Sequence, residues 1–351
     1  MEKSLFVRAC NGLQTTQTPI WLNRQAGRYM PDYHRVKGKT PSLDFFKNPE
    51  LAAEVTCDAQ RILGVDAAIL FADLLPILEP MGFKLDYFPE IGPVIENPIR
   101  AVSEIDSVET KKSSESMPYI REAITLIKSS LPADIPLIGF GGAPFTLTSY
   151  AIEGGSSKSY IFVKKLMRSH PQKFRELMDK MTDSIIDYLN YQILCGVDAI
   201  QVFDSWVGCL GVSDYERHVY PHTKRLFESL IKGVPVIHFG TGNPALLRLM
   251  AAAGGDVMAL DWRAPLTESW NDLGCKSIQG NLDPVALFGS QRSVIKAAKE
   301  ILDDVAGRPG HIFNLGHGIL PQTPLENVKV LVRVVKDYSS EVKSRYQSLG
   351  Y

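Results

Sequence analysis

Residues 65–73 read VDAAILFAD, a short apolar run that ends in an acidic residue. Such a run is typical of a strand buried on both faces, as in parallel sheets. The preceding residues repeat apolar side chains at helical spacing behind Asn48 and Pro49, a common helix start. The sequence therefore predicts a helix at about 49–63 followed by a buried strand at 65–73.

The same pattern recurs along the chain. Further short apolar runs occupy residues 19–24, 136–144, 198–206, 235–242, 257–262, 277–283 and 311–318. Helical segments separate them, and no G-x-G-x-x-G segment opens a first helix. This alternation favours an α/β fold with a single (β/α)8 TIM-type barrel over a doubly wound sheet. We expect residues 1–351 to form one domain with its active site at the carboxyl ends of the strands.

Some segments fall outside the alternation. We expect a hairpin at 83–97, a Gly-Ser loop at 154–157 and a last amphipathic helix at about 324–345. Two helix starts are also predicted: a capping box from Ser213 to Glu216, and the Asn243-Pro244 pair.

Composition excludes several classes of protein. The chain has 38 Lys and Arg against 39 Asp and Glu, so no global positive field suggests nucleic acid or an anionic membrane as partner. It begins without the apolar core of a signal peptide, and no apolar run approaches the roughly 18 residues of a membrane helix. The 5 cysteines are scattered and form no C-x-x-C. We expect a cytoplasmic protein with reduced, mostly buried cysteines.

Residues 19–35, PIWLNRQAGRYMPDYHR, place two arginines just after the first expected strand. Arg24 and Arg28 are separated by a segment that includes the small residues Ala26 and Gly27. A guanidinium keeps its charge, and its planar fork fits a carboxylate or phosphate. These residues alone leave two interpretations open: an anion clamp, or a solvated loop whose arginines pair with surface acids.

Polar or aromatic side chains follow most of the expected strands, and these ends share one face of a barrel. They are Asp73, Tyr150, Phe203, Asp204, Ser205, His238, Asp261, Trp262, Arg263, Asn314 and His317. Asp73 is followed by apolar residues, which favours a carboxylate facing the barrel mouth over a helix cap. His317 lies between glycines that let backbone approach a ligand, or it packs under a turn as a structural histidine. We interpret His238 as structural.

Two other chemistries are disfavoured. Ser205 with His317 lacks a G-x-S-x-G elbow and an obvious orienting acid, which argues against acyl transfer. The sequence contains no H-E-x-x-H, H-x-x-E-H or clustered Cys/His spacing, so no metal site is predicted.

Six segments together resemble the uroporphyrinogen decarboxylase family of haem biosynthesis, over nearly the whole chain. They are WLNRQAGRYMPDY (21–33), ILFADLL (69–75), GGAPFTLTSYAIEGG (141–155), FDSW (203–206), QGNLDP (279–284) and NLGHGI (314–319). RQAGR at 24–28 is the most specific of them. One departure is visible: the residue before RQAGR is usually methionine in the family and is Asn23 here.

The resemblance implies removal of carbon dioxide from the four acetate side chains of uroporphyrinogen III, giving coproporphyrinogen III, by a homodimer. An acetate can lose carbon dioxide if the adjacent pyrrole carbon is protonated, because the cationic ring then accepts the electrons. The substrate is its own electron sink, so no cofactor is expected.

The resemblance also assigns roles to residues. Asp73 and Arg24 would be catalytic, with Asp73 accepting hydrogen bonds from the pyrrole N–H groups and stabilising the cation. Arg24 and Arg28 would hold substrate carboxylates. The other substrate-binding residues would be Gln25, Ala26 and Gly27, through backbone groups, the donors Tyr150, Ser205 and His317, and the apolar Phe203. The proton donor stays open, because arginine is a poor acid and a protonated Asp73 would not be an anion.

Two rival functions remain. A zinc- and cobamide-dependent methyltransferase is similar in fold, but its zinc ligands include an H-x-C motif where this chain reads His238-Phe239-Gly240. A non-catalytic porphyrin-binding barrel is the other.

Overall fold

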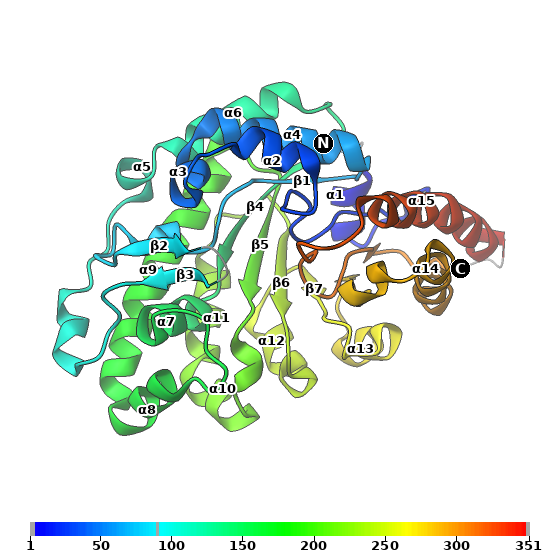
Figure 1. Cartoon of the computed structure of the whole chain (residues 1–351). Helices are drawn as coiled ribbons and strands as arrows, with labels where there is room; N and C mark the ends of the chain where they lie inside the picture. The colour runs from blue at the N-terminus through cyan, green and yellow to red at the C-terminus, as the bar shows by residue number, and fades with distance from the viewer. Residues whose placement is uncertain (1–3, 89–90, 349–351) are drawn as a thin grey trace.

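A curled, parallel sheet forms the centre of the protein (Figure 1), and the computed structural model describes residues 4–88 and 91–348. Its strands are β1 (Ala68–Ile69), β4 (Leu137–Gly142), β5 (Ala199–Asp204), β6 (Val236–Gly240), β7 (Val257–Ala259), β8 (Ser277–Gln279) and β9 (His311–Ile312). They lie in chain order, β1-β4-β5-β6-β7-β8-β9, and every neighbouring pair is parallel. The expected strands from 65–73 onwards are confirmed.

The first expected strand, at 19–24, is not a regular strand. Ile20 forms an isolated parallel bridge with Phe313, beyond β9. On its other side, the Asp66 N–H donates to the Ile20 carbonyl (2.8 Å). Side chains take the place of strand partners here: the Ile20 N–H donates to Asp66 Oδ2 (2.9 Å), and the Leu22 N–H to Gln25 Oε1 (3.3 Å). The prediction of a regular strand was therefore wrong, although the segment lies beside both edges of the sheet.

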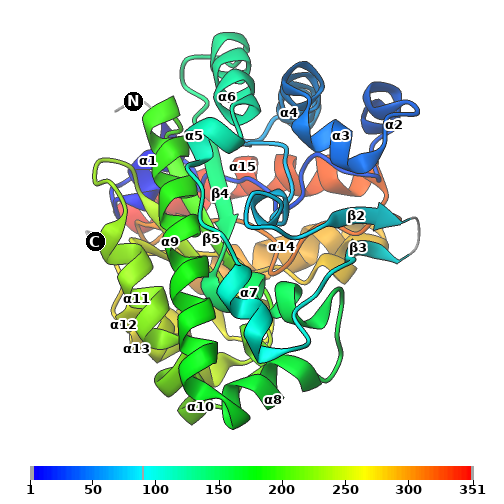
Figure 2. The same ribbon diagram turned by 90° about the vertical axis from the view of Figure 1, so that its left-hand side faces the viewer.

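Helices pack around the outer face of the sheet (Figures 1 and 2). They are α1 (Leu5–Cys10), α2 (Pro31–Lys37), α3 (Ser42–Lys47), α4 (Pro49–Leu63), α5 (Ser113–Ser116), α6 (Tyr119–Ser130), α7 (Pro144–Glu153), α8 (Ile161–Ser169), α9 (Pro171–Cys195), α10 (Val212–His218), α11 (Tyr220–Ser229), α12 (Leu247–Ala253), α13 (Leu266–Leu273), α14 (Gln291–Val305) and α15 (Leu325–Ser348). Short 3-10 helices are η1 (Pro76–Leu78), η2 (Val102–Ser107), η3 (Val207–Cys209), η4 (Pro244–Leu246) and η5 (Pro284–Phe288). In the described part of the chain, none of the helices has both the length and the apolar character to cross a membrane.

Local signals set several helix ends. Helix α4 begins as predicted, because Asn48 Oδ1 accepts a hydrogen bond from the Leu51 N–H (2.9 Å) and proline occupies the first position. The Asn243 side chain likewise caps a helix, but it is the short η4 ahead of α12. The predicted capping box at Ser213 is wrong, since α10 follows Gly211 and has no side-chain cap.

The expected additions to the sheet are present. Strands β2 (Leu85–Phe88) and β3 (Gly92–Ile95) form an antiparallel hairpin, within the predicted range of 83–97; residues 89–90 lie outside the described part. Helix α15 confirms the last predicted helix. All 5 cysteines are free, but only Cys10 is buried; the other four are partly exposed, so the expectation of mostly buried cysteines was wrong.

Asp66 joins the segment at 19–22 to the rest of the fold. Its Oδ2 accepts from the Ile20 N–H, while Oδ1 pairs with Lys336 Nζ of α15 (2.9 Å). Burial raises the pKa of this carboxyl, and the Lys336 ammonium opposes the rise. One carboxylate therefore holds a strand-like segment and a helix together.

Replacing Asp66 with alanine is expected to lower the free energy of unfolding by about 3 kcal/mol, because it leaves a half-buried ammonium and a buried N–H without their partner. Urea unfolding followed by tryptophan fluorescence measures the change. Asp337→Ala, which removes an exposed carboxylate from the same helix, is the matched control and should shift stability by less than about 0.5 kcal/mol. Equal losses in both variants would contradict the structural role of Asp66.

Candidate functional site

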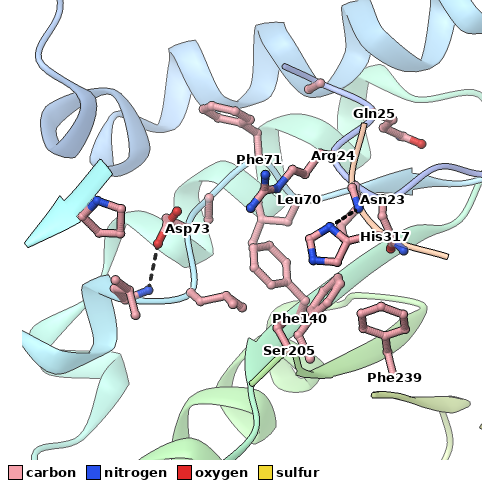
Figure 3. A pocket seen from close by; sticks show the side chains of 18 of the residues that line it. Asn23, Arg24, Gln25, Leu70, Phe71, Asp73, Phe140, Ser205, Phe239 and His317 are labelled. Atoms are coloured by element: carbon pink, nitrogen blue, oxygen red, sulfur yellow. Dashed lines mark hydrogen bonds between the residues drawn. The ribbon is translucent and has the colours of Figure 1, made fainter. Parts of the chain in front are cut away.

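A cavity of about 220 Å³ opens at the carboxyl ends of β1, β4, β5 and β6 (Figure 3). Most of its wall is apolar, and a few polar groups converge on it, as in many small-molecule sites. The apolar part of the wall includes Ile69, Leu70, Phe71, Ala72, Leu74, Leu75, Pro93, Phe140, Phe203 and Phe239.

The structure brings most of the proposed site residues to this cavity. Those that line it are Arg24, Gln25, Ala26, Asp73, Tyr150, Phe203, Ser205 and His317. Gly27 and Arg28 do not line it. Sequence reasoning missed Phe140 and Phe239, which lie in expected strands. Phe239 is the register partner of Phe203, and Phe140 pairs with the residue two positions before Phe203 in β5.

Arg24 supplies the positive charge of the cavity. Its side chain is exposed, and in Figure 3 the guanidinium points into the space between Asp73 and His317. Among the described residues, no ion pair involves Arg24 or Arg28. This favours the anion clamp over arginines that are paired with surface acids.

Gly318 makes room for that arginine. A Cβ atom at position 318 would lie 2.5 Å from Arg24 Cδ and 2.8 Å from Cγ. Non-bonded carbon atoms do not approach one another this closely. The aliphatic part of the Arg24 side chain therefore occupies the space that a side chain at position 318 would need.

Asp73 supplies the negative charge. Its Oδ1 accepts a hydrogen bond from the Leu75 N–H (3.1 Å), marked in Figure 3. Burial raises the pKa of this carboxyl, while the Tyr87 hydroxyl, the backbone N–H groups of Leu75 and Leu74, and the charge of Arg24 act in the opposite direction. Arg24 and Asp73 thus line one cavity without forming an ion pair with each other.

His317 presents a neutral imidazole. Its Nδ1 accepts a hydrogen bond from the Gly318 N–H (2.8 Å), so the neutral ring carries its proton on Nε2. Burial lowers the pKa of His317 to about 4, and the nearby charge of Arg24 acts in the same direction. The ring is therefore a hydrogen-bond donor through Nε2 at neutral pH.

Tyr150 approaches the cavity from α7. Its ring stacks on Trp206 with 3.7 Å between centroids. Burial raises the pKa of Tyr150, so its hydroxyl stays protonated and can donate a hydrogen bond.

The other polar strand ends do not line this cavity. Asp204 is buried, accepts from Thr146 Oγ1 (2.8 Å), and burial raises its pKa to about 7. His238 is buried with Nδ1 3.2 Å from the Gly254 carbonyl, and burial lowers its pKa to about 4. Asp261 accepts hydrogen bonds from three neighbouring residues. No group of three His, Cys, Asp or Glu side chains suited to a metal ion occurs in residues 4–88 and 91–348.

Comparison with known proteins identifies relatives along nearly the whole chain. The model of the uroporphyrinogen decarboxylase (URO-D) family matches residues 1–338. A uroporphyrinogen decarboxylase from Carboxydothermus hydrogenoformans is 51% identical over 337 residues, which cover 95% of this chain and 96% of that protein. One from Citrifermentans bemidjiense is 48% identical over 331 residues, covering 94% and 97%.

A solved structure shares the fold at lower identity. The methyltransferase from Methanosarcina mazei superposes with a TM-score of 0.81 and 21% identity, over 95% of this chain and 97% of that one. At this identity the likeness establishes the α/β fold alone.

His317 is expected to stay neutral well below its ordinary pKa of 6.5, since burial lowers the pKa of this imidazole in the folded protein to about 4. NMR titration of the imidazole, assigned by comparison with His317→Gln, measures this directly. The unfolded chain binds the proton near pH 6.5, so this group should make unfolding progressively easier as pH falls from 6.5 towards 4. A titration midpoint near 6.5 in the folded protein would contradict the burial argument.

Proposed function

Because this chain belongs to the uroporphyrinogen decarboxylase family, we propose that it removes carbon dioxide from the four acetate side chains of uroporphyrinogen III and releases coproporphyrinogen III. The observation that carries the proposal is that one cavity contains both a positive and a negative group. Arg24, which has no ion-pair partner among the described residues, and the Asp73 carboxylate both line this mostly apolar cavity (Figure 3). A substrate with many carboxylates needs the arginine, and a cationic pyrrole intermediate needs the carboxylate.

Asp73 is the proposed stabiliser of the reacting ring. Protonation of the pyrrole carbon next to an acetate makes the ring cationic, the C–C bond to the carboxylate breaks, and its electron pair neutralises the ring and leaves a methylene group. The methylene carbon then takes up a proton to become the methyl group, and the ring carbon gives up the proton that it had received. A carboxylate held among apolar residues stabilises such a cation far better than water does. The pyrrole N–H groups would donate to Asp73 and help to keep it ionised.

The remaining roles follow from the charge of the substrate. Arg24 would hold the carboxylate of the reacting acetate and Arg28 a carboxylate nearer the rim. Neutral donors complete the set: Tyr150, Ser205 and the His317 Nε2–H would bind further carboxylates. Gln25, Ala26 and Gly27 would contribute backbone groups, and Phe203 would pack against the macrocycle.

The cleft extends beyond the first cavity. A second hollow of about 440 Å³ shares Ser205, His317 and Gly318 with it. The two hollows adjoin at these residues, so a large macrocycle with long side chains has room on both sides of His317.

Three finer features belong to the same proposal. Residues 19–22 would act as the eighth strand that closes the barrel, supported by the bridge of Ile20 with Phe313 on one side and by the bond of the Asp66 N–H to the Ile20 carbonyl on the other. Residues 1–351 would form one domain. The protein would work in the cytoplasm as a homodimer, and sedimentation of the purified protein tests the dimer.

The methyltransferase alternative has weaker support. His238 is buried against Phe227, with ring centroids 4.6 Å apart, and the next residues are Phe239 and Gly240 rather than a thiolate ligand. Stoichiometric zinc in the purified protein would favour it.

Asp73→Asn is expected to reduce turnover at least a hundredfold, because an amide keeps the shape of the carboxylate but not its charge. An anaerobic assay that follows the number of carboxylates on the product measures this, with the melting temperature as a check of folding. Asp86→Asn, an exposed acid on the neighbouring hairpin, is the control and should keep full activity. Near-normal decarboxylation by Asp73→Asn would contradict the proposed role of Asp73 in stabilising the cationic ring.

Arg28→Lys should raise KM with little change in kcat, since lysine keeps the charge and loses the bidentate fork. Steady-state kinetics separate the two parameters. Arg35→Lys is the comparison, because Arg35 already pairs with Glu54 and Asp58 on the surface. A lower kcat at unchanged KM would refute a binding role for Arg28.

A further inference from the structure

Buried amide groups form a chain of hydrogen bonds that ends at the cavity. Trp21 Nε1 donates to Gln279 Oε1 (2.8 Å), Gln279 Nε2 to Gln201 Oε1 (2.9 Å), and Gln201 Nε2 to Asn23 Oδ1 (3.1 Å). All four side chains are buried. Of these four residues, Asn23 alone also lines the cavity.

Asn23 uses every one of its polar groups. Besides accepting from Gln201, it donates from its backbone N–H to Asn314 Oδ1 (2.9 Å) and from Nδ2 to the Leu315 carbonyl (3.3 Å). Its own carbonyl accepts from the Ile319 N–H (3.0 Å). The residue is thereby fixed to β5 and to the segment that follows β9.

The residue on the other side of Arg24 is fixed as well. Gln25 accepts from the Leu22 N–H through Oε1 and donates from Nε2 to the Ala67 carbonyl (3.3 Å each). Its backbone carbonyl accepts from the Tyr29 hydroxyl (2.6 Å). Arg24 is thus held at both ends, while its own guanidinium has no ion-pair partner among the described residues.

Arg24 needs such support because its backbone lies in the left-handed region, with φ of 60°. Residues with a Cβ rarely adopt this conformation, and it persists only where the surroundings impose it. Extended backbone at position 24 would aim the side chain in another direction. The bonds of Asn23 and Gln25 supply the constraint.

We propose that Asn23, which stands where the family usually has methionine, is a positioning residue in this protein: its side chain ends the row of buried amides and binds the segment after β9, and it thereby holds Arg24 in the left-handed conformation that aims the guanidinium into the cavity. Leucine has the branched shape of asparagine, with a larger volume, and none of the polar atoms of its side chain. At position 23 it would leave Gln201 Nε2 and the Leu315 carbonyl without partners, so that only the two backbone bonds, to Asn314 and from Ile319, would still hold residue 23 beside Arg24. An arginine that must reorganise on binding holds its ligand less well.

A double-mutant cycle tests this, using the decarboxylation assay and so resting on the proposed function. Asn23→Leu should lower kcat/KM by about tenfold to a hundredfold in the wild-type background. In the Arg24→Lys background the same substitution should change kcat/KM by less than about twofold, because the group it positions is already gone. An equal loss in both backgrounds, or no loss in either, would overturn the proposal.

Two further variants separate positioning from general destabilisation. Gln60→Leu removes a buried amide bonded to the Val65 carbonyl (3.1 Å), away from the cavity, and should lower the melting temperature without altering kcat/KM. If Asn23→Leu does not fold, Gln201→Leu removes the same hydrogen bond between Gln201 and Asn23. Its effect on kcat/KM should also be absent in the Arg24→Lys background. An effect that persists there would count against the proposal.

The crystal structure of Asn23→Leu tests the proposal independently of activity. If wild-type protein does not decarboxylate uroporphyrinogen, the proposed function fails, but the backbone angle at Arg24 can still be measured. Loss of the left-handed conformation in the variant supports positioning by Asn23, and its retention refutes it.

Discussion

The backbone N–H groups of Ile20, Leu22 and Asn23 donate their hydrogen bonds to side-chain oxygens, and the placement of the candidate site depends on these three bonds. Asp66 binds the N–H of Ile20, Gln25 that of Leu22, and Asn314 that of Asn23. A buried N–H without a partner is costly, so these three side chains must be present for the segment to stay where it is. The segment in turn places Arg24 at the carboxyl ends of the strands, beside the cavity.

The cavity separates its charges in a way that suits a charged ligand. Apolar walls strengthen the field of both Arg24 and Asp73, yet the two groups do not neutralise each other. His317 and Tyr150 add donors without adding charge, because burial keeps both in their neutral forms. A ligand that is negative at its edge and hydrogen-bond donating at its centre matches this arrangement.

Much of the fold could be predicted because it rests on local patterns. The apolar runs, the cap at Asn48 and the hairpin near 83–97 each depend on residues close in sequence. One failure involves a distant partner: 19–24 reads as a strand, but Asp66, from another segment, replaces the ladder bond of Ile20. The box at Ser213 fits the capping pattern, yet the chain is already helical one residue earlier, at Val212.

That Arg24 and Asp73 would lie at the cavity was predictable from the sequence, whereas its apolar walls were less so. Asp73 and His317 follow apolar runs, and strand ends meet at one face of such a sheet. Arg28 lies outside the cavity lining, because α2 begins at Pro31 and the chain turns away before it. Phe140 and Phe239 carry no chemical signal and are found only through the register of β4 and β6.

Gly318 matters for the placement of Arg24 although it has no side chain of its own. It has no side chain to bind a substrate or move a proton, yet the stem of Arg24 lies where its Cβ would be. Even an alanine there would push the guanidinium out of place while leaving the arginine in the sequence. A substitution at this glycine would therefore act through Arg24, and position 318 could accept a side chain only if the side chain at position 24 gave up that space.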